Sequence, residues 1–189
     1  LDVEAKSLEI LRPFIRRISL NGQYVVIEKG RLALEIQAVY GDIFINRKDG
    51  GISTIEIKSE NDDTYGNLFL ELWSNRSRFN PGWLYKLDVD HLFYHFINDD
   101  RFYTMSFPEL REWLFFCESG IRPRIYEYAP KLQTKNEQLN DTWGACVPIN
   151  KIRCAISSFR EFRASTGECI DSPIPIKQST PELPFARGA

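Results

Sequence analysis

Two short runs, Gly41-Asp42-Ile43-Phe44-Ile45 and Ser53-Thr54-Ile55-Glu56-Ile57-Lys58, stand on either side of an Asp49-Gly50-Gly51 turn. Their β-branched and apolar residues favour strands, and a Gly-Gly pair between two such runs is typical of a hairpin. We therefore expect strands over 42–46 and 52–59, paired with each other. Because side chains alternate along a strand, Ile55 and Ile57 should face the core while Glu56 and Lys58 share the opposite face.

The acidic residues of this hairpin suggest a metal site. Asp42 begins the first strand, so hairpin pairing can bring its carboxylate beside that of Glu56. Two adjacent carboxylates raise each other's pKa, and a hard divalent cation relieves that repulsion. Mg²⁺ commonly uses one or two carboxylates with water and substrate phosphate, and the Ile57 carbonyl could add a ligand. Lys58 would then stand beside the attacking water, an arrangement that suits hydrolysis of a phosphodiester.

A Glu-x-Lys pair alone is common on solvated strands and carries little weight. The Gly-Asp strand, the Gly-Gly turn and the framing isoleucines make the joint pattern more specific. With them, residues 2–75 resemble the PD-(D/E)XK nuclease superfamily, which includes type II restriction enzymes, archaeal Holliday-junction resolvases and phage exonucleases. The resemblance implies an α/β (α+β) fold, with a restriction endonuclease-like mixed central β-sheet flanked by helices. It also implies cleavage of DNA, less often RNA, that depends on Mg²⁺, with Mn²⁺ as a substitute.

The resemblance also assigns roles. Asp42 and Glu56 match the metal-binding acids of the superfamily, and Lys58 matches its catalytic lysine. Many members carry a further Glu or Gln on the helix before the Asp strand. Glu35 and Gln37 both lie on such an expected helix, and one of them is the candidate. Glu4 and Glu9 on the first helix are the alternatives.

Two features depart from the superfamily pattern. Gly41 stands where the family name has proline, a frequent replacement. The family core usually places a helix after the E-x-K strand, whereas 67–73 reads as another strand. The segment 66–84 is similar to small uncharacterised phage and bacterial proteins.

The remaining pattern predicts one domain over 1–165 and a Pro-rich tail over 166–189. A helix is expected over 2–19, with Pro13 kinking or interrupting it, and a short helix over 32–40, with Leu32, Ile36 and Val39 on one face. The other expected elements are strands over 23–28, 91–97, 102–107 and 142–149, and helices over 108–117 and 151–162.

A basic and aromatic segment follows the strand over 67–73. Arg76, Arg78, Trp83 and Lys86 combine cations with an indole, which suits phosphate contact and base stacking. A surface loop in which Trp83 anchors the chain to the core fits the same residues equally well. Further positive charge lies in an irregular segment, at Arg122, Arg124, Lys131 and Lys135.

Composition restricts the function classes. The chain has 189 residues and a formal net charge of -2, which excludes coating nucleic acid by bulk charge but not a local basic groove. No apolar run approaches the roughly 20 residues of a membrane helix, and no secretory signal is visible, so a cytoplasmic protein is expected. The four cysteines form no C-x-x-C, which favours free thiols, and His91 with His95 lacks a third zinc ligand. Glu60 and Glu71 are extra acids near the hairpin.

Two hypotheses follow. The first is a Mg²⁺-dependent nuclease acting on nucleic acid, with DNA as the expected polymer and a homodimer favoured if both strands are cut. The second is a catalytically inactive nucleic-acid-binding or regulatory subunit of the same fold. A pure scaffold has no reason to gather repelling acids, which argues for the first, while the acidic net charge argues mildly for the second.

Overall fold

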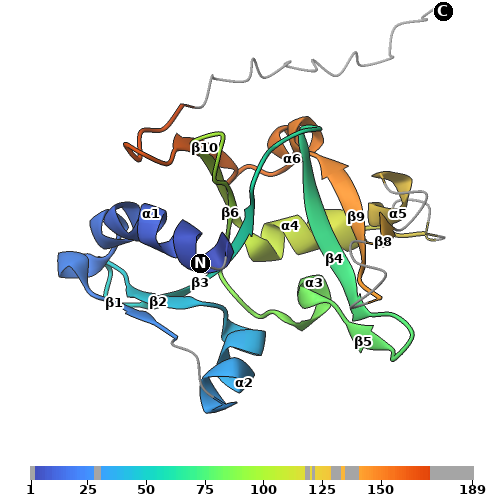
Figure 1. Ribbon diagram of the computed structural model, residues 1–189, viewed down its shortest axis with the longest axis horizontal. Coiled ribbons are helices and arrows are strands. Elements are labelled where there is room, and N and C mark those ends of the chain that lie inside the picture. Colours follow the sequence, from blue (N-terminus) through green and yellow to red (C-terminus); the bar gives the residue numbers. More distant parts are fainter. Residues whose placement is uncertain are drawn as a thin grey trace, which may run out of the picture.

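The computed structural model describes residues 3–27, 31–117, 120, 122–128, 133–134 and 141–170. Within these residues the chain is a mixed α/β protein with two sheets (Figure 1). The helical elements are α1 (Val3–Ile18), η1 (Leu20–Gly22), α2 (Arg31–Tyr40), α3 (Trp83–Lys86), α4 (Phe107–Phe115), α5 (Ile125–Tyr128) and α6 (Ile149–Ala155). The strands are β1 (Tyr24–Val26), β2 (Ile43–Asn46), β3 (Ile52–Glu60), β4 (Asn67–Asn75), β5 (Asn80–Pro81), β6 (His91–Phe96), β7 (Arg101–Ser106), β8 (Gln133–Thr134), β9 (Trp143–Pro148) and β10 (Arg160–Arg163).

The larger sheet has the strand order β1-β2-β3-β6-β7-β10. The expected hairpin forms its first half, because β2 and β3 pair antiparallel with Ile43 opposite Ile55. β3 and β6 pair in parallel, whereas the other strand pairs are antiparallel, so the sheet is mixed. The smaller sheet has the order β5-β4-β9-β8 and is antiparallel.

Apolar side chains cover both faces of the larger sheet. On one face α1 packs Leu11, Phe14 and Ile15 against Ile55 and Ile57 of β3. On the other face, the second sheet and α4 form the larger core (Figure 1). That core contains Leu68, Leu70, Leu72, Leu92, Tyr94, Phe96, Leu110, Leu114, Ala145 and Val147. The strand β6 is thus enclosed between two apolar layers, whereas β3 contributes apolar side chains only to the layer under α1.

The alternation expected for β3 is confirmed. Ile55 and Ile57 are buried under α1, and Glu56 and Lys58 lie on the opposite face of the strand. The strand expected after the E-x-K strand is also present, as β4, and it belongs to the second sheet.

Other expectations were wrong in part. Pro13 does not interrupt α1, which continues through it to Ile18. The helix expected over 151–162 ends at Ala155, and the chain then forms β10, whose pairing with β7 outweighs local preference. The expected apolar face of α2 is not a core face, because Leu32 and Val39 are exposed.

The described residues beyond 165 turn back onto β10, where the backbone of Cys169 forms an isolated antiparallel β-bridge with Phe162. The rest of the expected tail, from 171 on, lies outside the described residues, as do Lys131 and Lys135. No described helix has the length and apolar character that crossing a membrane requires.

Candidate active site

A cavity of about 270 Å³ opens where the hairpin meets α2, α3 and β4. Acidic, basic and amide side chains converge in it from elements far apart in the sequence. Its lining consists of Glu4, Leu34, Gln37, Ala38, Asp42, Glu56, Lys58, Glu71, Trp83, Lys86 and Leu87.

Gly41 sets the position of Asp42. It has a φ of +80°, which favours glycine, and its N–H donates to the Gln37 carbonyl at 3.1 Å as α2 ends. A Cβ on Gly41 would lie 2.7 Å from the Ile55 carbonyl oxygen and 2.9 Å from Val89 Cγ1. Glycine therefore allows the end of α2 to lie directly against β3.

The Asp42 carboxylate is held by two donors. Gln37 Nε2 donates to Oδ1, and the Ile57 N–H donates to Oδ2 at 2.7 Å. Each carboxylate oxygen keeps a further lone pair with which it can accept another ligand. Because the N–H and C=O of one residue point to the same side of an extended strand, the Ile57 carbonyl also lies on the Asp42 side of β3.

Glu56 is the most buried acid of the cavity, with a relative exposure of 4%. Its Oε1 lies 2.5 Å from Lys58 Nζ, and its Oε2 is buried without a hydrogen-bond partner. Burial raises the pKa of Glu56 to about 7, and the charge of Asp42 adds to this while Lys58 opposes it. An orphaned carboxylate oxygen in the interior is costly, and a cation is one way to satisfy it.

Lys58 stays charged in this setting. Burial works against its ammonium group, but attraction by Glu56 and Glu4 outweighs burial and raises the pKa of Lys58 above its usual range. Its Nζ lies 3.7 Å from Glu4 Oε1 and 5.8 Å from the centre of the Trp83 ring. The ammonium is therefore fixed between two carboxylates and an indole.

The donor set fits a hard divalent cation. Asp42 and Glu56 supply carboxylates, the Ile57 carbonyl lies on the same side, and Mg²⁺ typically completes its shell with water and phosphate. Across the described ranges of the chain, no three or more His, Cys, Asp or Glu side chains gather closely enough to hold a metal.

The structure separates the two candidates on α2. Gln37 bonds Asp42 and lines the cavity, whereas Glu35 is exposed and is not part of the lining. Of the alternatives on α1, Glu4 lines the cavity, and Glu9 pairs with Arg12 at 2.6 Å on the surface.

The nucleic-acid candidates fall into two groups. Trp83 and Lys86 line the cavity, and Trp83 is half-buried against the larger core, with its ring 6.1 Å from that of Phe107. Arg76 and Arg78 lie on the β4–β5 turn and do not line it. Arg76 places its guanidinium 4.3 Å from the centre of the Trp143 ring.

Glu71, one of the two extra acids near the hairpin, lines the cavity from β4. Its Oε1 accepts a hydrogen bond from the Trp83 N–H at 3.2 Å, which ties α3 to the second sheet. The polar interruption of an apolar strand was the only sequence signal for it. Glu60, the other extra acid, accepts a hydrogen bond from Tyr94 and does not line the cavity.

No family model, curated protein or solved structure matches this chain.

Proposed function

We propose that this chain is a divalent-metal-dependent nuclease of the restriction endonuclease-like type, hydrolysing phosphodiester bonds in nucleic acid, with DNA as the expected substrate. The observation that carries the proposal is the Glu56 carboxylate, which is buried with one oxygen orphaned, contacts Lys58 through the other, and lies within the electrostatic influence of Asp42. A mixed sheet with the E-x-K strand at its centre is consistent with it.

In this proposal Asp42 and Glu56 hold Mg²⁺, with the Ile57 carbonyl as a third protein ligand. The bound ion would acidify a water and offset negative charge on the phosphate. Gln37 and the Ile57 N–H hold Asp42 in one orientation, which keeps its carboxylate pointed into the cavity. Lys58, charged and fixed, orients the attacking water and stabilises the charge that develops on the phosphate oxygens.

The other walls of the cavity would receive the polymer. Lys86 is exposed at the rim and offers a phosphate contact, and Trp83 presents part of its indole to the cavity. Cutting both strands of a duplex would require two such sites, which favours a homodimer during turnover.

A second candidate function is binding of nucleic acid without turnover. The 2.5 Å contact between Lys58 and Glu56 favours it, because the lysine already neutralises the buried acid in the absence of a cation. A protein of that kind would bind DNA and leave it intact under every metal condition.

A cleavage assay separates the two. Linear, circular and branched DNA and RNA are incubated with Mg²⁺, Mn²⁺ or EDTA. The proposal expects cleavage with either metal, none with EDTA, and loss of cleavage in Asp42→Asn and Glu56→Gln. Glu112→Gln, which removes an exposed carboxylate on α4, is the matched control and should cleave normally. Binding without cleavage under every condition would favour the second candidate.

A further inference from the structure

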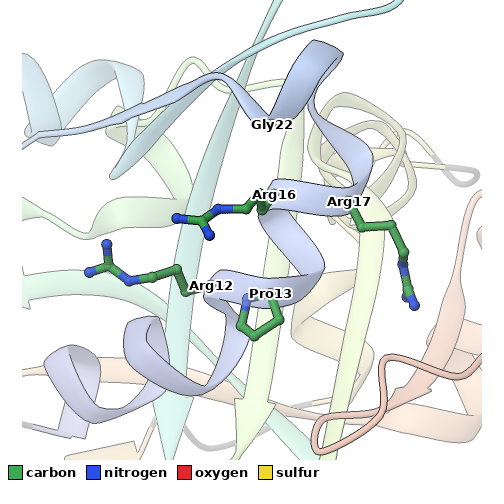
Figure 2. Close-up of a pocket in the computed structure, with 5 residues that line it drawn as sticks. All are labelled: Arg12, Pro13, Arg16, Arg17 and Gly22. Carbon is green, nitrogen blue, oxygen red and sulfur yellow. The ribbon is translucent and has the colours of Figure 1, made fainter.

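A second hollow lies on the surface of α1, away from the candidate active site. It has a volume of about 460 Å³ and is lined by Arg12, Pro13, Arg16, Arg17 and Gly22. Figure 2 shows the guanidinium groups of Arg12 and Arg16 extending to the same side of the helix, while Arg17 extends to the other side.

The two arginines on the shared side have donors to spare. Arg12 binds Glu9 Oε1 at 2.6 Å and the Tyr24 hydroxyl at 3.4 Å, while its buried Nε has no hydrogen-bond partner. Arg16 is exposed, and within the described ranges its guanidinium has no hydrogen bond or ion pair. Arg17, by contrast, donates to the Gly167 carbonyl and lies over Phe14.

The backbone is shaped to hold Arg16 in place. Gly22 has a φ of +69°, and a Cβ there would lie 3.0 Å from Cγ of Arg16. The absence of that Cβ lets the aliphatic part of Arg16 lie against η1. Guanidinium groups with free donors are suited to planar, bidentate contact with phosphate oxygens.

The geometry points to a phosphate-contacting surface at Arg12 and Arg16 that receives the backbone of a DNA substrate at a distance from the cut. This inference rests on the proposed function. Arg12 and Arg16 follow Glu4, which lines the active-site cavity, by about 12 and 18 Å along the helix axis at ~1.5 Å per residue. With ~3.4 Å of rise per nucleotide in a duplex, that span corresponds to roughly four to five nucleotides from the scissile phosphate.

The experiment measures how duplex binding depends on salt. A labelled DNA duplex of about two helical turns, ~20 base pairs, is titrated with full-length protein, with Ca²⁺ replacing Mg²⁺ to suppress cleavage. The slope of log affinity against log salt should flatten by nearly one unit in Arg16→Gln, since each lost phosphate contact removes ~0.9. Adding Arg12→Gln should flatten it further. Lys151→Gln, which changes the net charge equally at an exposed position on α6 outside the hollow, should keep the wild-type slope.

Several results would overturn the inference. A wild-type slope in Arg16→Gln would remove this surface from the interface, and equal flattening in Lys151→Gln would reduce the effect to bulk charge. If calorimetry shows that inorganic phosphate binds and that Arg16→Gln abolishes only that binding, the hollow is a small-anion site instead. If the wild-type protein binds no duplex, the proposed function fails with it. If it binds and cleaves while Arg16→Gln is unchanged, this inference alone fails.

Discussion

The carboxyl group of Glu56 combines two properties that rarely occur together: it is withdrawn from water, and one of its oxygens has no partner. Burying an ion pair costs desolvation energy that the mutual attraction of the charges does not reliably recover. The contact with Lys58 is therefore a weak source of stability. A requirement for charge at this point in the cavity explains the pair better than a structural role does.

Substitutions of Lys58 and Glu56 should differ in their effect on metal binding. We expect Lys58→Ala to lower single-turnover cleavage by about 10²- to 10³-fold, the cost typical of losing one group that stabilises transition-state charge. Binding of Mn²⁺ should be retained, because in the proposed mechanism the lysine acts on water and phosphate rather than on the ion. Lys151→Ala, an exposed lysine on α6, is the control and should cleave as wild type does. Equal loss of metal binding in Lys58→Ala and Glu56→Gln would instead make the lysine a structural partner of the acids.

A second buried group couples the fold to pH. His95 is fully buried and bonds Ser7 at 2.7 Å, and burial lowers the pKa of His95 to about 4. Since the unfolded chain takes up this proton near the ordinary value of 6.5 and the folded chain does not, the stability that neutral His95 contributes is fully present above pH 6.5. It should fall as the pH drops from 6.5 towards 4.

Thermal melting from neutral to mildly acidic pH measures this effect. The decrease in Tm across the window should be smaller in His95→Gln than in wild type, although the variant starts from a lower Tm. Parallel curves for the two proteins would show that other groups control the acid sensitivity.

At the scale of elements, the end of α2 and the start of β2 form the link that places Asp42. Gly41 ends the helix, and the Asp42 N–H donates to the Ile55 carbonyl at 2.9 Å, so the acid is in register with β3 before its side chain makes any contact. The Gln37 bond to Asp42 then spans the same link.

Comparing the stability cost of two glycine substitutions tests how closely α2 and β3 approach at this link. Gly41→Ala combines a positive φ with a close approach to backbone and should cost more than the ~1 kcal/mol typical of the conformation alone. It should also lower cleavage, because the carboxylate of Asp42 moves. Gly50 also has a positive φ, +86°, but nothing lies within 4 Å of an added Cβ. Gly50→Ala should therefore lower the free energy of unfolding only by the cost of the backbone conformation. Chemical denaturation of both variants checks the ranking, and equal costs would contradict the close-approach argument.

The sequence was sufficient for the hairpin because its signals are local: alternating residues, a Gly-Gly turn and an acid at the strand start. It was insufficient where contacts between residues far apart in the chain determine the local structure. Arg160–Arg163 is a strand because β7 lies beside it, and Arg76 lies over Trp143, a residue close to it only in the fold. The helix over 32–40 was found by its periodicity, yet periodicity could not show that Leu32 stays exposed.

At the scale of the whole molecule, the cavity lies where the two sheets meet. The central strand β3 lines one side of it, and β4 of the second sheet lines another together with the helix α3. Glu71 joins these parts through the Trp83 N–H. A nucleic acid bound in the cavity would therefore contact residues from both sheets.

The two arginines of the β4–β5 turn should have different roles, Arg78 in binding DNA and Arg76 in stabilising the fold. Both arginines are exposed, but the guanidinium of Arg76 lies over Trp143. Arg78→Gln should therefore flatten the salt slope of DNA binding by up to about one unit. Arg76→Gln should mainly lower stability, by ~0.5–1 kcal/mol, because its guanidinium lies over Trp143. Salt-series binding and denaturation on the same preparations measure both quantities. An unchanged slope in Arg78→Gln would exclude the turn from the interface.

A calorimetric titration of Mn²⁺ into the wild-type protein and into Glu56→Gln, without nucleic acid, measures directly whether the two acids form a metal site. We expect wild type to bind the metal with release of protons, since the pKa of Glu56 is about 7 and the ion displaces the proton. Glu56→Gln should keep its fold by circular dichroism and lose the binding heat. Equal Mn²⁺ binding by the two proteins, or none by either, would contradict the claim that Asp42 and Glu56 form a metal site.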